Sequence, residues 1–128
     1  MIVDSSAVLA ILLREPERHS FEDAILASDS NKISAVNFVE AAVVADAREG
    51  AGLSQFDALL REFQVEILPV TAQQAYSARQ AYMDYGKGRH PAGLNLGDCF
   101  AYALAKVSNE PLLFKGNDFR KTDVESAL

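Results

Sequence analysis

The chain begins with MIVDSSAVLAIL, residues 1–12, a strand-like run followed by a helix-like run that is typical of α/β proteins. Residues 1–3 are typical of a short buried strand, and the apolar residues up to 13 are typical of a helix capped by Ser5 or Ser6. Asp4 stands between the two, at the end of the predicted strand. Ligands of open α/β sheets bind beyond the carboxyl ends of the strands. Asp4 is therefore a candidate ligand-binding group, although a lone Asp before a helix is more often a cap.

The rest of the chain alternates short apolar runs with longer helical stretches. Further strands are predicted at residues 32–35, 65–68 and 111–114, with a short edge strand from residue 124. Helices are predicted from near residue 16 and over residues 37–49, 54–63, 71–85 and 98–107, the 37–49 helix being stopped by Gly50 and Gly52. This order predicts an α/β fold around a mainly parallel sheet. No linker divides the sequence, so residues 1–128 are predicted to form a single domain.

Composition narrows the functional classes. The longest apolar run has seven residues, 7–13, whereas a membrane-spanning helix needs about 20. No secretory signal is recognisable, and the single cysteine, Cys99, cannot form an internal disulfide, so a cytoplasmic location is predicted. The formal net charge of −6 argues against nucleic acid as a partner, since phosphate binding depends on Lys and Arg.

Three further acids stand at informative positions. Asp118 follows the predicted strand 111–114 after a turn, where it can equally be an ordinary turn residue. Glu40 shares a helical stripe with Val36, Asn37, Val43 and Val44, and the apolar members predict that this stripe faces the core. A carboxylate there needs a raised pKa, a cation, or a cleft onto which the stripe opens, unless it reaches solvent at the edge of the stripe. Asp98 begins the helix 98–107, where capping alone is an adequate explanation.

Taken together, these acids predict a metal site. Asp4, Glu40, Asp98 and Asp118 all lie at strand ends or on helices that a parallel sheet can bring to one edge. Clustered carboxylates stay ionised only with a cation, and hard oxygen ligands favour Mg²⁺ or Mn²⁺. Zinc is not expected, because the two histidines, His19 and His90, are far apart and are predicted to lie at the surface.

Four segments resemble one known family. IVDSSA at the start, VNFVEAA near residue 40, LNLGDCFAYALA near residue 98 and LLFKGNDFRKTD near residue 118 are together similar to the PIN domain of VapC-type toxins, from residue 2 to residue 123. The resemblance implies a three-layer α/β/α sandwich. It also implies an acidic quartet of Asp4, Glu40, Asp98 and Asp118 that binds Mg²⁺ or Mn²⁺.

The implied activity is endonucleolytic hydrolysis of RNA, with metal-bound water as the nucleophile. The implied partners are an RNA substrate, a VapB-type antitoxin and a second toxin chain, in a homodimer or a toxin–antitoxin hetero-oligomer. Ser6 matches a hydroxyl position of the family, and Asn117 or Asp123 could assist Asp118 through water. Cys99 is interpreted as a small helix residue.

Basic and apolar residues complete the hypothesis. The glycine-rich segment 86–97 is predicted to be a mobile loop that guides RNA with nearby basic side chains, namely Lys87, Arg89, Lys115, Arg120 and Lys121. Six apolar residues could form partner interfaces or belong to the core: Phe21, Ile25, Phe56, Leu59, Leu60 and Phe63.

Other functions fit the sequence less well. A phosphoryl-transfer receiver domain needs paired acids after its first strand, and a phosphatase with an Asp-x-Asp nucleophile needs an acid where Ser6 stands. A catalytically inactive PIN-like module that binds RNA or a partner is the remaining alternative.

Overall fold

Four parallel strands form the centre of the computed structural model, which describes residues 1–49 and 54–128. The strand order is β3-β2-β1-β4. In chain order the elements are β1 (Ile2–Val3), α1 (Ser5–Leu12), α2 (Arg18–Ala27), β2 (Asn31–Ser34), α3 (Ala35–Glu49), α4 (Ser54–Glu62), β3 (Val65–Leu68), α5 (Ala72–Tyr85), α6 (Leu96–Ser108), β4 (Leu112–Leu113) and the 3-10 helix η1 (Phe119–Lys121). The predicted α/β class and parallel sheet are confirmed.

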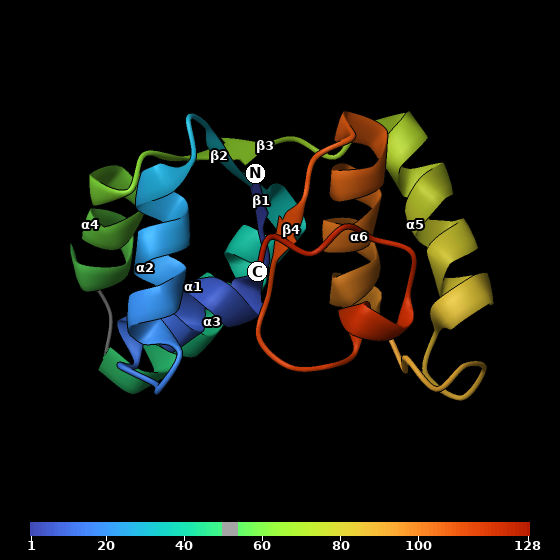
Figure 1. Ribbon diagram of the computed structural model, residues 1–128, viewed down its shortest axis with the longest axis horizontal. Coiled ribbons are helices and arrows are strands. Elements are labelled where there is room, and N and C mark those ends of the chain that lie inside the picture. Colours follow the sequence, from blue (N-terminus) through green and yellow to red (C-terminus); the bar gives the residue numbers. More distant parts are fainter. Residues whose placement is uncertain (50–53) are drawn as a thin grey trace.

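Helices cover both faces of the sheet, as the three-layer prediction requires (Figure 1). Successive strand residues point to opposite faces. Val3 and Leu113 accordingly join the apolar cluster under α1, α2 and α4, while Ile2 and Leu112 join the cluster under α5 and α6. Helix α3 contacts both α1 and α6, so it spans the two halves near the ends of the strands.

The carboxyl ends of the strands meet at one edge of the sheet. Ile2 pairs with Lys32 of β2 and with Leu112 of β4, so β1 is central and Asp4 follows it directly. The N–H of Asp4 donates to the carbonyl of Leu113 (2.9 Å), which extends the contact with β4 to the acid itself. Residues that follow β1, β2 and β4 are therefore neighbours in space.

The predicted edge strand from residue 124 needs correction. The segment from residue 124 forms only an isolated bridge between Leu112 and Ser126, because so short a strand as β4 offers few partners. The predicted stop at Gly50 and Gly52 lies outside the described residues.

Among the described residues, no helix is both long and apolar enough to cross a lipid bilayer.

The six apolar residues considered for interfaces are core residues. Five of them are at most 8% exposed, and Phe63 packs against the same cluster on the α1 side of the sheet. Their predicted alternative as partner contacts is wrong, because burying them already stabilises this domain.

Candidate metal centre

Asp4 combines a structural role with an unsatisfied oxygen. It is the N-cap of α1, since its Oδ2 accepts hydrogen bonds from the Ser6 N–H (3.0 Å) and the Ser6 Oγ (2.6 Å). The prediction that Ser5 or Ser6 is the cap is therefore wrong, because the earlier acid already occupies that position. The side chain is 2% exposed, and its Oδ1 has no hydrogen-bond partner among the described residues. A buried, unpartnered carboxylate oxygen calls for a cation or a proton.

Electrostatics agree with this geometry. Burial raises the pKa of Asp4, the hydrogen bonds from Ser6 oppose that rise, and the charge of Glu40 adds to it. A buried carboxylate next to a second negative charge favours a proton, or a metal ion that replaces it, and this describes Asp4.

Glu40 lies on α3 beside a hollow instead of in the core. Val43 is 62% exposed and Val44 37%, so the predicted core-facing stripe is wrong. The core residues of the helix are Ala41 and Ala45. A hollow of about 710 Å³ is lined by Ala35, Val36, Val39, Glu40, Val43 and Val44. The stripe therefore opens onto a cleft, which is one of the explanations considered for a carboxylate at this position.

The Glu40 carboxylate turns toward the start of α6. Its Oε1 accepts a hydrogen bond from the Asn37 Nδ2 (2.9 Å), and the same amide nitrogen donates to the Gly97 carbonyl (3.0 Å). Gly97 directly precedes Asp98. This bond pattern brings α3 and α6 together next to Asp98, although the two residues are far apart in sequence.

Asp98 sits in a reciprocal cap. Its N–H donates to the Asn95 Oδ1 (2.8 Å), and its Oδ2 accepts from the Asn95 N–H (3.0 Å). The helix therefore starts at Leu96, two residues before the predicted start, with Asn95 as its N-cap. The Asn-x-x-Asp spacing was visible in the sequence and could have predicted this cap.

Burial and neighbouring acids raise the pKa of Asp98. Burial raises it to about 6, the hydrogen bond from the Asn95 backbone opposes that rise, and the charges of Asp4, Glu40 and Asp118 add to it. Asp98 is therefore within electrostatic range of each of the other three predicted acids.

Asp118 is the outermost of the four. It is exposed, on the turn before η1, and that turn depends on Gly116, whose φ of 94° is in the left-handed region. Asn117 is exposed beside it. Asp123 is engaged elsewhere, because its carboxylate accepts from the Tyr102 hydroxyl (2.5 Å) and from the Lys106 Nζ (3.1 Å).

The acids are neighbours without forming a closed cage. Within residues 1–49 and 54–128, no three His, Cys, Asp or Glu side chains form a group that could hold a metal ion. Asp98 is turned back to its cap, whereas Asn37 holds the Glu40 carboxylate at the start of α6. Closing the carboxylates around one cation therefore requires rotation of the Asp98 side chain.

Ser6 couples two parts of the site. Its Oγ donates to Asp4 and accepts from the Lys115 N–H (3.0 Å), which ties the loop carrying Asp118 to the first acid. Ser6 matches the family's hydroxyl position. The helical spacing places Asn37 on the stripe of Glu40, but no sequence pattern predicted the contact of either residue with Gly97.

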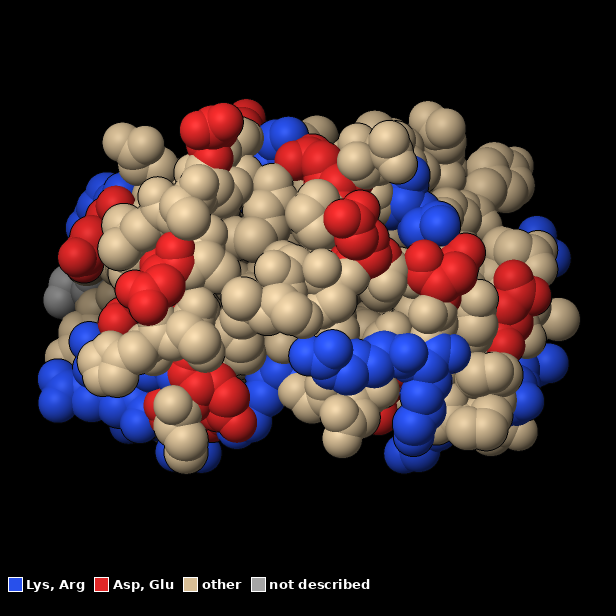
Figure 2. Space-filling model, in the orientation of Figure 1, with Lys and Arg blue, Asp and Glu red and all other residues tan. Residues whose placement is uncertain are grey.

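Basic side chains gather along the same edge. Figure 2 shows Lys and Arg along the lower edge of the view, where Figure 1 has the loop after β4 and η1. Lys87, Arg89, Arg120 and Lys121 are exposed. Lys115 is different, because its Nζ pairs with Glu15 and, at 3.5 Å, with Glu17. These pairs already neutralise Lys115 in the free chain.

The loop 86–97 is anchored, which corrects the prediction of a mobile loop. Leu94 is buried, and its N–H donates to the Tyr85 carbonyl (3.0 Å). His90 is half-buried instead of at the surface, with its Nδ1 accepting from the Ala92 N–H (3.0 Å) and its ring edge-on to Tyr85. These buried side chains anchor the loop in spite of its glycines.

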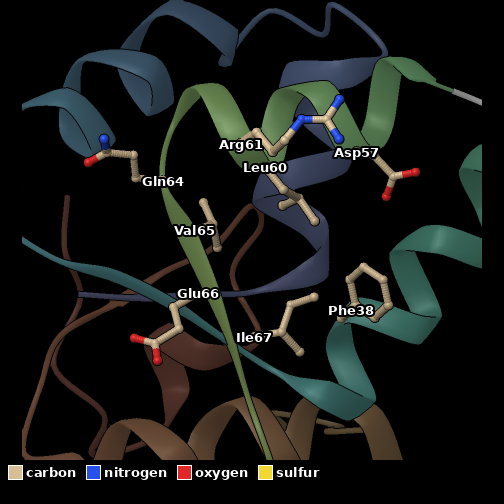
Figure 3. Close-up of a pocket in the computed structure, with 8 residues that line it drawn as sticks. All are labelled: Phe38, Asp57, Leu60, Arg61, Gln64, Val65, Glu66 and Ile67. Atoms are coloured by element: carbon tan, nitrogen blue, oxygen red, sulfur yellow. The ribbon is translucent and has the colours of Figure 1, made fainter.

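A second hollow lies away from the acids. It measures about 400 Å³ between α4 and β3 and is lined by Phe38, Asp57, Leu60, Arg61, Gln64, Val65, Glu66 and Ile67 (Figure 3). None of the four predicted acids lines it, so it is not part of the candidate metal centre.

Comparison with known proteins identifies the family. The sequence matches the PIN domain over residues 1–125. The chain belongs to the PIN-domain family. It is 48% identical over 125 residues to ribonuclease VapC30 of Mycobacterium tuberculosis, covering 97% of this chain and 95% of that protein. It is 49% identical over 125 residues to ribonuclease VapC of Mycolicibacterium smegmatis, covering 97% of each. The chain is thus a VapC-type PIN domain.

Solved structures with low sequence identity share the fold. One is a toxin–antitoxin complex from Klebsiella pneumoniae, with a TM-score of 0.71, 18% identity, and 95% of this chain and 92% of that chain covered. Another is Mycobacterium tuberculosis VapC20, described as a sarcin-ricin loop cleaving toxin, with a TM-score of 0.74, 14% identity, and 96% and 95% covered. Both confirm the predicted PIN-like sandwich.

Proposed function

We propose that this VapC-type PIN domain is the ribonuclease toxin of a toxin–antitoxin pair and is an endoribonuclease dependent on Mg²⁺ or Mn²⁺. Its relatives named as ribonucleases match almost their whole length, which supports RNA as the substrate class. The observation that carries the metal proposal is the buried Asp4 Oδ1, which has no described partner and lies within the field of Glu40.

Asp4, Glu40, Asp98 and Asp118 would hold the metal. They fit a hard divalent cation, since all are oxygen donors and their mutual repulsion, felt most at Asp98, is relieved by positive charge. When bound, Mg²⁺ or Mn²⁺ supplies a water of lowered pKa and stabilises charge on a phosphodiester. Asp98 would have to turn away from the Asn95 N–H to take part.

The chain's own residues prepare the site for that cation. Ser6 holds Asp4 Oδ2, so the unpartnered Oδ1 is the free ligand atom. Cys99 is buried, and burial together with the charge of Asp98 raises the pKa of its thiol to about 11. A neutral thiol is a poor nucleophile, which agrees with metal-bound water in that role.

RNA would approach over the basic edge. Lys87, Arg89, Arg120 and Lys121 are exposed there, so local attraction can overcome the net charge of −6. Replacing Lys87 and Arg89 by Ala should weaken RNA cleavage and reduce its salt dependence. Unchanged cleavage and salt dependence would exclude these two residues from RNA binding.

The proposed partners are a VapB-type antitoxin and a second copy of the toxin, in a homodimer or a toxin–antitoxin hetero-oligomer. A fold neighbour solved as a toxin–antitoxin complex supports the antitoxin. We also propose that residues 1–128 act as one domain and that the protein works in the cytoplasm, where its RNA substrate would be found.

The decisive experiment uses the purified chain free of antitoxin. Wild-type protein and the Asp4→Asn and Asp98→Asn variants are incubated with total RNA and Mg²⁺ or Mn²⁺, with EDTA as the metal control. We expect RNA decay only in the wild type with metal. Asp123→Asn is the matched control, because Asp123 is engaged by Tyr102 and Lys106, and it should cleave like the wild type.

A catalytically inactive RNA- or partner-binding module is the second candidate. It is favoured by the finding that, among the described residues, no three ligand-type side chains form a group ready to hold a metal. RNA binding without decay in the wild type, with either metal, would establish this alternative. Equal decay in the wild type and both acid variants would exclude the proposed site.

A further inference from the structure

The Glu40 carboxylate lies so close to Gly97 that a residue with a side chain at position 97 would clash with it. A β-carbon added at residue 97 would lie 2.0 Å from Glu40 Oε2, 2.3 Å from its Cδ and 2.4 Å from its Oε1. Apart from atoms of their own residue and its chain neighbours, real β-carbons essentially never come within 3.0 Å of a heavy atom. The Glu40 carboxylate therefore occupies the place of the missing side chain on the first turn of α6.

Asn37 holds the carboxylate in that place. Its side chain is 0% exposed, and its Nδ2 donates both to Glu40 Oε1 (2.9 Å) and to the Gly97 carbonyl (3.0 Å). Both partners are acceptors, so only the amide nitrogen can face them, and the orientation of the amide is determined. One buried donor thus connects the glutamate of α3 to the residue before Asp98.

We propose that Gly97 and Asn37 are positioning residues that seat the Glu40 carboxylate beside Asp98. Gly97 provides the space, and Asn37 fixes one oxygen. The inference rests on the proposed function in so far as Glu40 is a metal ligand. Groups that orient metal ligands commonly change metal affinity by 10–100-fold when they are replaced.

Helix stability does not explain the glycine. Glycine is a poor helix former, and Gly97 is within α6 without a left-handed φ, so alanine suits the backbone there. The three atoms nearest to an added β-carbon all belong to the flexible end of Glu40. A Gly97→Ala variant should therefore fold, with its Glu40 carboxylate displaced.

The first test measures Mn²⁺ binding to the full chain by electron paramagnetic resonance of free Mn²⁺. We expect Gly97→Ala and Asn37→Ala to bind Mn²⁺ about tenfold or more weakly than the wild type. Ser77→Ala is the control, because it adds a helix-favouring residue on α5, away from the site, and should leave Mn²⁺ affinity unchanged. Wild-type affinity in Gly97→Ala would overturn the inference.

The second test needs no metal. Melting temperatures are compared, with EDTA, for Gly97→Ala in the wild-type and the Glu40→Ala backgrounds. We expect alanine at residue 97 to raise the melting temperature by about 3 °C when Glu40 is absent, and by clearly less when its carboxylate must move. An equal rise in both backgrounds would overturn the inference that Gly97 makes room for the Glu40 carboxylate. A smaller rise in the wild-type background, together with no Mn²⁺ binding by the wild type, would support the positioning of Glu40 and refute the proposed metal dependence.

Discussion

Asp98→Asn should separate stability from metal binding. Burial, together with the charges of Asp4, Glu40 and Asp118, raises the pKa of Asp98 from 3.8 to about 6 despite the bond from Asn95. The folded chain therefore holds a proton that the unfolded chain loses more easily. This contribution to stability is complete below about pH 4 and is lost as the pH rises through about 6.

The magnitude follows from those two values. Each pH unit between them corresponds to about 1.4 kcal/mol, which sums to ~3 kcal/mol for Asp98. The side chain is only half-buried, and solvent screening reduces the effect to about 1–2 kcal/mol. Asparagine removes the charge and keeps an oxygen that can accept from the Asn95 N–H, so the cap is retained. At about pH 8 the metal-free variant should be more stable than the wild type by that amount.

Urea denaturation with EDTA at about pH 4 and about pH 8 measures this difference. The variant and the wild type should agree at the lower pH and differ at the higher one. Asp118→Asn is the matched control, because this exposed residue should change the free energy of unfolding by less than about 0.5 kcal/mol. A variant that is no more stable than the wild type at about pH 8 would refute the reasoning.

Three further predictions concern the scaffold. Asn95→Ala should lower the free energy of unfolding by about 0.5–2 kcal/mol in urea, because it removes the cap of α6. Cys99 should react with a thiol reagent only after unfolding, since the thiol is buried and its pKa is raised to about 11; rapid labelling of the folded chain would contradict this. Burial tends to raise the pKa of Glu110, but hydrogen bonds from Lys32 and the Met1 ammonium outweigh it and lower the pKa. Glu110→Gln should therefore lower the free energy of unfolding in urea by about 1 kcal/mol at neutral pH. The difference from the wild type should vanish as acid protonates the wild-type carboxylate.

The order of helices and strands was predictable because hydrophobic periodicity and helix-breaking Gly and Pro residues act locally in the sequence. The strand at residues 65–68 and the helix ending at Tyr85 are found where the sequence predicts them. The sequence predicts the start of α6 at Asp98, whereas the helix starts at Leu96 with Asn95 as its N-cap. Caps depend on which of several competent side chains comes first, and periodicity alone does not decide that.

The acids could be named from the sequence, but their surroundings could not. Val43 and Val44 share a helical stripe with Glu40, yet which stripe of α3 faces the core depends on where α1 and α6 lie. The pairing of Lys115 with Glu15 joins residues 100 positions apart. Such contacts depend on tertiary packing, so residue patterns could only propose Lys115 as a basic group near the site.

The two borders of the sheet differ in their exposure to other chains. The N–H of Leu112 on β4 donates to Glu125 (2.9 Å), so the C-terminal segment covers that border. On β3, no second strand pairs with the outer side among the described residues. Uncovered strands invite intermolecular aggregation, and short length and charge oppose it. With only four residues and the exposed Glu66 among them, β3 is a poor template for pairing with a strand of another chain.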